Sequence, residues 1–306
     1  LNTIVIRARE QGVGGDSSPR KVIEEYLHSM AVSNYNPIAN YLDGIGEWDG
    51  NDHVSSLFNR LPGVSDEMKA YLRIWLRSMV AHWLQMDTLH GNECVPVLIG
   101  EQGCGKSTFC NRLLPPELRS YFFDHISFSN RFDLEMALTH ALLVNIDEFN
   151  VMTPSQMAKL KQNLSKVKVN SRPIFGRTTE DRPRYSSFIA TTNERHPLCD
   201  PTGSRRFLCI EIPSGEFIDN ESPIDYAQLY AQILHELSLL GTRYWFTRDE
   251  ENRIQELNSA FMKTDDIDMM IASSFDLENS ESQGQWMSGN EVVNVLCRNY
   301  SQLKAD

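Results

Sequence analysis

Four short apolar segments stand out in the middle of the chain: VPVLIG (95–100), ALLVNI (141–146), SFIATT (187–192) and FLCIEI (207–212). Stretches with helical spacing of apolar residues separate them. Near-continuous apolar strands are typical of a parallel sheet that is buried on both faces and connected through helices. The pattern therefore predicts an α/β core with a parallel sheet.

Helical patterns dominate the sequence on both sides of this core. Ahead of it, one apolar stripe with helical spacing consists of Met68, Tyr71, Leu72, Trp75, Met79 and Trp83. Three further helix starts carry capping residues, namely Thr153-Pro154, Thr247 with Glu250, and Ser288 with Glu291. We therefore expect helices on both sides of the sheet-forming segments and one within the core.

These patterns divide the 306 residues into three regions. We expect a mostly helical N-terminal region over residues 1–90, the core over 91–214, and an acidic helical C-terminal region over 215–306, whose last helix is compatible with the start of a winged helix. Hydrophobic residues make up 41% and charged residues 23%, as in soluble globular proteins. No apolar run approaches the roughly 20 residues that span a bilayer, so we expect no membrane contact. A first residue other than Met indicates a cut from a longer polypeptide.

The cysteines bear on the cellular compartment. All six lack C-x-x-C pairing and zinc-ligand spacing. No secretory signal opens the chain. We therefore expect reduced thiols in a cytoplasmic protein.

The charge is unevenly distributed along the chain. The net charge is −12, but residues 159–206 contain 11 Lys and Arg against 4 Asp and Glu, a local balance of +7. The other 258 residues therefore carry −19. A concentrated basic segment suits an anionic partner, whereas a solvated basic face is the alternative interpretation.

The segment GEQGCGKS (100–107) fits the pattern G-x-x-x-x-G-K-[ST] between an apolar strand and a predicted helix. Glycines allow backbone N–H groups to surround a β-phosphate, the lysine reaches the β- and γ-phosphates, and the hydroxyl binds Mg²⁺. The predicted ATP-binding residues are Gly100, Gly103, Gly105, Lys106, Ser107 and Thr108. A chance glycine turn is the weaker alternative, because the flanking strand and helix are both predicted.

Two carboxylates follow the second apolar segment. Asp147 and Glu148 stand at the carboxyl end of a predicted strand, where ligands gather in open α/β sheets. We expect Asp147 to hold Mg²⁺ and Glu148 to deprotonate the attacking water. A solvated acidic loop is the alternative.

Polar residues also mark the last two strands. Asn193 ends the third apolar segment, where it can contact the γ-phosphate and the attacking water, although an ordinary turn is the alternative. Arg205 and Arg206 precede the fourth segment, and one of them can act as an arginine finger for a neighbouring subunit. Because adjacent strand residues point to opposite faces, we expect only one of the two to do so. A salt bridge or a DNA phosphate contact is the alternative role.

Taken in order, these motifs resemble the additional-strand P-loop ATPases of the AAA+ group. More closely, the chain resembles the virulence-associated protein E family, which is related to superfamily-three helicases and to poxvirus-type primase-helicases. The resemblance covers about residues 36–212 and rests on NPIANYL, EWDG, GEQGCGKST, VNIDEFN, SRPIFGR, ATTN and DPTGSRRF. It implies an AAA+-like P-loop ATPase core.

The resemblance also implies how such a chain assembles and binds DNA. It implies a ring, usually a hexamer, with ATP between subunits and single-stranded nucleic acid in the central pore. A hairpin within VKVNSRPIFGRTTEDRPRY would line that pore, so we expect Lys168, Arg172 and Arg177 to contact DNA. The arginine beside an aromatic residue, Arg206, is implied as the finger. No primase signature is present, so a primase domain either lies outside this chain or is absent, and a separate primase protein is a further possible partner.

The acidic residues nearest in sequence to the basic residues of the hairpin are Glu180 and Asp181. We expect Arg182 and Arg184 to pair with them. That pairing would leave the hairpin bases available for phosphate contacts that do not depend on nucleotide sequence.

Together these features predict an Mg²⁺-dependent ATPase that works as a replicative DNA helicase of a prophage or mobile element. A nucleotide-dependent switch that does not translocate DNA is the main alternative. A small-molecule P-loop kinase is weaker, because no acceptor-binding lid is evident. Stimulation of ATP hydrolysis by DNA would separate the motor from the switch.

Overall fold

A computed structural model gives the fold of the chain. It describes residues 1–14, 18–27, 29, 31–32, 35–86, 89–171, 179–200, 203–263, 271, 274–275 and 287–299. The chain divides into two compact units, Leu1–Ile45 and Gly46–Asp306. The first unit contains the helices α1 (Asn2–Glu10), α2 (Arg20–Leu27) and α3 (Pro37–Leu42).

The second unit contains the sheet and the remaining helices. Its α-helices are α4 (His53–Phe58), α5 (Asp66–Trp83), α6 (Lys106–Arg112), α7 (Arg131–His140), α8 (Pro154–Leu164), α9 (Tyr226–Ser238), α10 (Arg248–Leu257) and α12 (Gly289–Asn299). Its strands are β1 (Val95–Ile99), β2 (Phe122–Phe123), β3 (Leu143–Ile146), β4 (Lys168–Ser171), β5 (Glu180–Pro183), β6 (Ser187–Thr192) and β7 (Phe207–Glu211). Its 3₁₀-helices are η1 (Pro116–Tyr121), η2 (Phe149–Val151), η3 (Ser204–Arg206) and η4 (Asn258–Phe261).

Five strands form a parallel sheet in the order β2-β3-β6-β1-β7. The four strands that the apolar segments predict are all present, with ends within two residues of the predicted bounds. The register aligns Ile146 with Ala190 and Ala190 with Val97, so β3, β6 and β1 end at one edge of the sheet. The predicted α/β core with a parallel sheet is confirmed. The antiparallel pair β4–β5 forms a separate hairpin.

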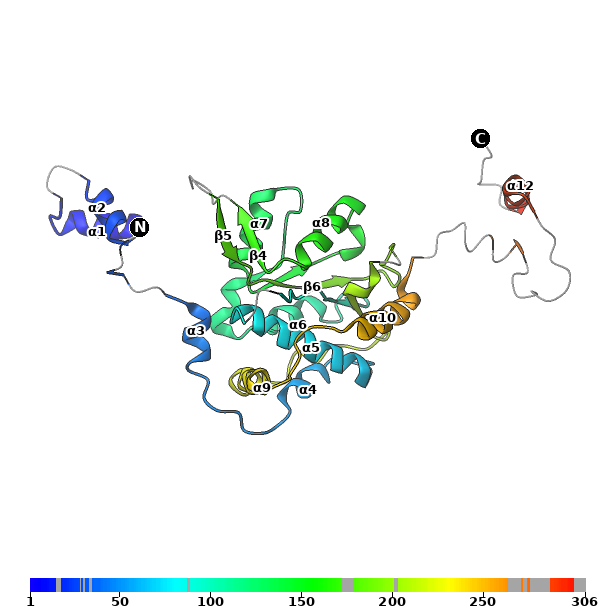
Figure 1. Cartoon of the computed structure of the whole chain (residues 1–306), viewed down its shortest axis with the longest axis horizontal. Coiled ribbons are helices and arrows are strands. Elements are labelled where there is room, and N and C mark those ends of the chain that lie inside the picture. Colours follow the sequence, from blue (N-terminus) through cyan, green and yellow to red (C-terminus); the bar gives the residue numbers. More distant parts are fainter. Residues whose placement is uncertain are drawn as a thin grey trace. The chain divides into compact units, whose positions relative to one another are not determined.

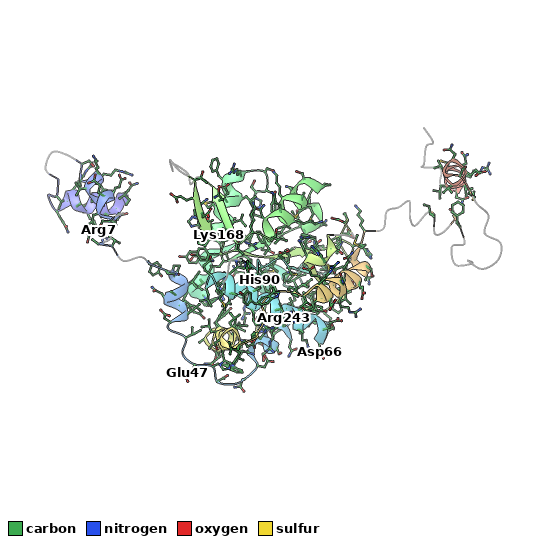
Figure 2. The ribbon with its side chains drawn as sticks, in the orientation of Figure 1. Arg7, Glu47, Asp66, His90, Lys168 and Arg243 are labelled. Carbon is green, nitrogen blue, oxygen red and sulfur yellow. The ribbon has the colours of Figure 1, made fainter. Side chains whose placement is uncertain are left out.

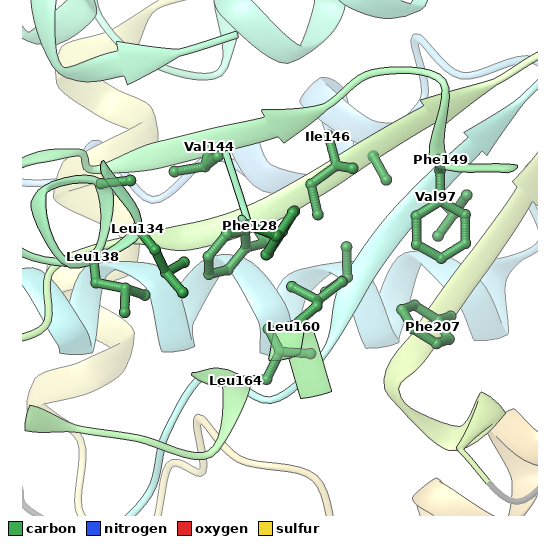
Figure 3. Close-up of a cluster of buried hydrophobic side chains, with 14 of the residues drawn as sticks. Val97, Phe128, Leu134, Leu138, Val144, Ile146, Phe149, Leu160, Leu164 and Phe207 are labelled. Carbon is green, nitrogen blue, oxygen red and sulfur yellow. The ribbon is translucent and has the colours of Figure 1, made fainter. Parts of the chain in front are cut away.

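Helices α7 and α8 cover one face of the sheet, and α5, α6 and α9 lie on the other side (Figure 1). On the α7–α8 face, apolar side chains from strands and helices meet in one buried cluster (Figure 3). Val144 and Ile146 of β3 contribute to it, as do Leu138 of α7 and Leu160 of α8. Burial of this apolar surface fixes where α8 lies relative to the sheet.

The other face is covered by the helix predicted from the apolar stripe. Trp75 of α5 is fully buried, and Trp83 stacks on Tyr230 of α9 with ring centroids 5.4 Å apart. Trp83 Nε1 also donates to Leu142 O at 3.5 Å, next to β3. Helix α5 therefore belongs to the packing of the sheet. Among the helices of the described residues, none combines the length and apolar character needed to cross a membrane.

The predicted helix starts are confirmed. Thr153 and Gln156 form a capping box at α8, which also has proline in its first turn. Thr247 and Glu250 form another at α10. At α12, Glu291 accepts from Ser288 N at 2.7 Å and donates its own backbone N–H to Ser288 Oγ at 3.4 Å.

Candidate active site

The loop between β1 and α6 contains the glycine-rich motif. Gly103 and Gly105 have φ angles of 86° and 96°, which residues with a Cβ atom rarely adopt. A Cβ atom on Gly105 would lie 2.5 Å from Asn220 Nδ2, whereas one on Gly103 would meet no atom within 4 Å. Both positions therefore require glycine, and the space beside Gly103 is open.

Lys106 begins α6 and is only 7% exposed. Its Nζ donates to Gly100 O at 2.7 Å, to Glu101 O at 2.8 Å and to Asn193 Oδ1 at 3.0 Å. All three acceptors are neutral oxygens, and no ion pair with a carboxylate forms within the described part of the chain. The structure therefore brings together two of the predicted site residues, Lys106 and Asn193, and leaves the charge of the lysine uncompensated.

The next two residues of the motif face outwards. Ser107 and Thr108 are exposed in the first turn of α6, while Phe109 and Cys110 are buried beneath them. Apolar packing of the second pair therefore orients the first pair away from the core.

Asp147 follows the last residue of β3. Thr191 Oγ1, near the end of the adjacent strand β6, donates a hydrogen bond to its carboxylate. One residue further, Thr192 Oγ1 donates to Asn150 Oδ1 at 2.8 Å. Strand β6 therefore positions the loop after β3 as well as carrying Asn193 at its own tip.

Glu148 has a left-handed backbone, with φ 51° and ψ 46°. Such a conformation is uncommon for a residue other than glycine, and strained residues of this kind cluster at functional sites. Its carboxylate is exposed. Together with Asp147, Asp124, His125 and Gln156 it lines a cavity of about 410 Å³.

Metal binding by protein ligands alone has no support in the described residues. They include no group of three or more His, Cys, Asp or Glu side chains that could hold an ion. Mg²⁺ in nucleotide sites, however, commonly uses one or two protein oxygens together with substrate phosphates and water. Ser107 and Asp147 offer a hydroxyl and a carboxylate of the type that such an ion prefers. All six cysteines are free thiols.

The two arginines of the SRRF sequence lie in η3 and not on β7. The expectation that they alternate across a strand is therefore wrong. Arg205 Nη1 binds Glu251 Oε2 at 2.8 Å, so this arginine forms a salt bridge. Arg206 Nε lies 3.8 Å from Glu93 Oε2, and this nitrogen has no hydrogen-bond partner among the described residues. Arg206 therefore has the longer ion pair of the two, while its side chain is the more buried.

The hairpin β4–β5 carries the predicted nucleic-acid contacts. Lys168 opens β4, where it is exposed, and Figure 2 labels it on this hairpin. Arg172 and Arg177 lie outside the described residues. The expected pairing of Glu180 and Asp181 with Arg182 and Arg184 is wrong, as the partners of the two arginines show.

Arg182 Nη2 lies 3.7 Å from Glu135 Oε2 on α7. Arg184 is fully buried, and no carboxylate in the described part of the chain forms an ion pair with it. Its guanidinium instead donates to five backbone carbonyls, those of Asn92, Asn163, Leu164, Lys166 and Ser186, at 2.6–3.2 Å. Burial lowers the pKa of Arg184 to about 9, so the group is still charged at neutral pH.

These contacts tie together four segments beside the hairpin. Three of the carbonyls lie at the end of α8 or just beyond it, where helices have unpaired acceptors. His82 of α5 completes the arrangement: Asn92 N donates to its Nε2 at 2.8 Å, so Nδ1 carries the proton and donates to Arg184 O at 3.2 Å. Arg184 therefore joins α5, α8, the segment before β1 and the start of β6.

Sequence reasoning missed three of these features. The hydroxyl of Thr191 and the cage around Arg184 depend on contacts between distant segments, so no local pattern signals them. The left-handed backbone at Glu148 has no sequence signal either, because glutamate rarely adopts it. Only the position of Thr191, two residues before Asn193, could have suggested a polar role.

One family model matches most of the chain. The sequence model of the virulence-associated protein E-like domain matches residues 42–263. No curated protein matches the chain at a significant level.

Solved structures of the C-terminal region of NrS-1 in apo form are similar to the chain. One A-form structure has 14% identity and a TM-score of 0.46, and it covers 80% of this chain and 58% of the other. A second A-form structure has 16% identity and a TM-score of 0.40, with 75% and 48% covered. A third structure has 14% identity and a TM-score of 0.45, with 80% and 59% covered. The chain thus spans about half to three fifths of the length of these structures.

Proposed function

The chain belongs to the virulence-associated protein E-like family, and from this premise we propose that it is an ATP-hydrolysing, ring-forming motor that acts on single-stranded DNA. The observation that carries the proposal is the hydrogen bond from Lys106 Nζ to Asn193 Oδ1 at 3.0 Å. It joins two motif residues at the sheet edge where Asp147 also lies. A lysine, an amide and a carboxylate at this edge suit the hydrolysis of a γ-phosphate.

The side chains would divide the reaction between them. Lys106 would bind the β- and γ-phosphates, because an anion can replace the neutral carbonyls that now accept from its ammonium group. Asn193, already beside this nitrogen, would orient the attacking water. The Glu148 carboxylate would accept a proton from that water.

The oxygen donors fit Mg²⁺. Ser107 would supply its hydroxyl and Asp147 its carboxylate, and the hydrogen bond from Thr191 already orients the latter. Bound there, the ion would offset negative charge on the phosphates. The exposed position of Ser107 and the open space beside Gly103 leave room for the nucleotide phosphates.

Arg206 supports the ring. Phe207 pairs with Val95 at the start of β1, whereas Gly100 follows the end of that strand. At about 3.3 Å per residue, Arg206 therefore lies about 20 Å from Gly100 along the strand direction. That separation exceeds the reach of an arginine side chain, so Arg206 can serve as a finger only for a neighbouring subunit. We propose a hexamer in which it does so.

The hairpin would provide the contact with DNA. Lys168 is exposed on β4, and Arg172 and Arg177 follow in the same hairpin sequence. Cations on a pore-lining hairpin bind phosphates without reading sequence. A replicative helicase of a prophage or mobile element would need such contacts, together with a primase domain or protein outside this chain.

Hydrolysis of ATP with and without single-stranded DNA tests the proposal. We expect Mg²⁺-dependent hydrolysis that an oligothymidylate stimulates. Hydrolysis that DNA leaves unchanged would favour the nucleotide-dependent switch. Absence of hydrolysis in folded wild-type protein would overturn both.

A further inference from the structure

Carboxylate partners divide the cations of the basic segment 159–206 into two groups. Five of them form ion pairs with Asp or Glu, namely Lys161, Arg182, Arg195, Arg205 and Arg206. Lys159, Lys166 and Lys168 form no ion pair with any carboxylate of the described residues. Arg184 also lacks a carboxylate partner among the described residues, but it is fully buried. Among the described cations of the segment, these three exposed lysines therefore hold the charge that can meet an anion at the surface.

All three lysines line one cavity of about 470 Å³ between α7, α8 and β4. Lys159 Nζ donates to Phe128 O and Lys166 Nζ donates to Asn163 Oδ1, each at 2.9 Å. These contacts hold the lysines in place with neutral acceptors. Because an ammonium group has three donors, each lysine keeps capacity for an anion.

The rest of the cavity lining consists largely of apolar side chains and amides. Phe128, Leu134 and Val169 are buried there. The amide side chains are those of Gln162, Asn163 and Asn170. Asn163 is buried and bonds to Lys159 and Lys166, whereas the exposed amide of Gln162 is open to a ligand. Apolar side chains beside such an amide suit a nucleobase, whose faces are apolar and whose edges form hydrogen bonds.

One carboxylate, Glu135, also belongs to the described lining. Arg131 Nε binds it at 2.7 Å, and Arg182 approaches it to 3.7 Å. Its charge is therefore already balanced. With Arg131 and the three lysines against Glu135, the lining carries a net charge of +3 in a chain whose net charge is −12.

We propose that this cavity binds one nucleotide of a single-stranded DNA, with the lysines on the phosphates that flank it and its base against the apolar part of the lining. Its volume lies within the range of about 300–1,000 Å³ for small-molecule sites. The position suits a DNA strand, because β4 leads directly into the hairpin sequence. This inference rests on the proposed function and extends the DNA contact from the hairpin to the groove between α7 and α8.

Binding of a dye-labelled oligothymidylate, measured by anisotropy over a range of salt, tests the cavity. Lys159→Gln and Lys166→Gln remove the charge but keep an amide donor. For single strands, each lost phosphate contact flattens the log–log salt slope by about 0.7, which is about fivefold in affinity at about 0.1 M salt. The double variant should therefore bind about 25-fold more weakly.

Lys161→Gln is the matched control, because Lys161 lies on α8 as Lys159 does but binds Asp200 at 2.5 Å. It should bind the oligothymidylate as the wild type does. If the charge-neutral Lys159 variant melts early, Lys166→Gln alone carries the test, with an expected loss of about fivefold, because Lys166 is exposed and is not one of the proposed hairpin contacts.

Three results would overturn the inference: wild-type affinity and slope in the double variant, an equal loss in the Lys161 control, or no binding by the wild type. Displacement of the oligothymidylate by thymidine monophosphate, at concentrations equal in phosphate, would assign the cavity to a free nucleotide instead. The proposed motor fails separately, through absent ATP hydrolysis in a wild type whose DNA binding still depends on the lysines.

Discussion

The two edges of the parallel sheet hold positive charge in different ways. At the carboxyl edge, Lys106 is buried against neutral oxygens next to an open space. At the amino edge, Arg184 is fully enclosed by five carbonyls, and Arg206 lies near Glu93. The first edge holds its charge in a loop beside the open space at Gly103, whereas the second uses buried charge to join segments of the fold.

Helix α8 connects the two edges. It begins at Pro154, a few residues after Glu148, and carbonyls at its far end accept from Arg184. Strand β6 makes a second connection, because Ser186, just ahead of it, also accepts from Arg184 and its tip leads to Asn193. Two elements, α8 and β6, therefore run from the residues around Arg184 to the candidate site for ATP.

The largest effect should come from the carboxyl edge. Lys106→Ala removes the ammonium group proposed for the β- and γ-phosphates, and we expect ATP hydrolysis to fall about a thousandfold or more. Steady-state phosphate release measures this loss. Circular dichroism should show an unchanged fold, because the partners of the lysine are two loop carbonyls, the Cys104 sulfur and Asn193. Wild-type turnover by a folded variant would remove the site from this edge.

Substitutions at the amino edge should lower the stability of the fold. Arg184→Met keeps much of the side-chain volume but leaves five buried carbonyls without their donor, so we expect a loss of about 3 kcal/mol in the free energy of unfolding. Arg184→Lys should lose less, because an ammonium group can still donate to some of them. Chemical denaturation of both variants measures the difference.

Gln232→Leu is a control for this loss. Gln232 is also buried and hydrogen-bonded, but it lies on α9 with Val54 and Asp52 as partners. If Arg184 links the hairpin to the ATP site, Arg184→Lys should reduce stimulation by DNA, whereas Gln232→Leu should lower stability alone. Equal stimulation in both variants would limit Arg184 to a structural role.

The sequence located the loop and helix at the carboxyl edge but did not predict the contacts of Arg184 at the amino edge, for a physical reason. The motif around Lys106 needs glycines with positive φ and a particular order of residues, all of which are local. The hydrogen-bond partners of Arg184 instead lie at the end of α8 and at Asn92, which are distant in sequence. A count of neighbouring charges therefore paired it with nearby acids, although packing had buried it.

The same contrast explains the outcome for the arginine pair. The apolar run after Arg206 predicted β7 correctly, but the 3₁₀ turn before it places Arg205 against Glu251 of α10. The hydrophobic pattern thus located the strand. It held no information about the turn or its partner helix.

Substitutions of the two carboxylates after β3 should have effects of intermediate size on ATP hydrolysis, and the effects should differ between the two residues. Glu148→Gln removes the proposed base but keeps a similar shape, so it should bind Mg²⁺ and ATP while turnover falls about a hundredfold. Asp147→Asn should instead weaken the part of ATP binding that depends on Mg²⁺. Binding of a fluorescent ATP analogue with and without Mg²⁺, beside turnover, distinguishes them. Near-normal turnover by Glu148→Gln would place the base on another residue.

The smallest expected effect is a partial rescue of ATP hydrolysis in rings that mix two inactive variants. It tests whether the amino edge of one subunit acts on the carboxyl edge of the next. Arg206→Ala subunits keep an intact carboxyl edge, and Lys106→Ala subunits keep an intact Arg206 at the amino edge. In an equal mixture, about one interface in four would combine an intact P-loop with an intact finger, so activity should return to about a quarter of wild type. Each variant alone should stay nearly inactive. Phosphate release from mixtures, with mixed rings verified by differently tagged subunits, measures the rescue. Arg206 and Gly100 lie at opposite ends of adjacent parallel strands, which is why we expect Arg206 to act on a neighbouring subunit. If Arg206 acted within its own subunit instead, no mixing ratio would restore activity.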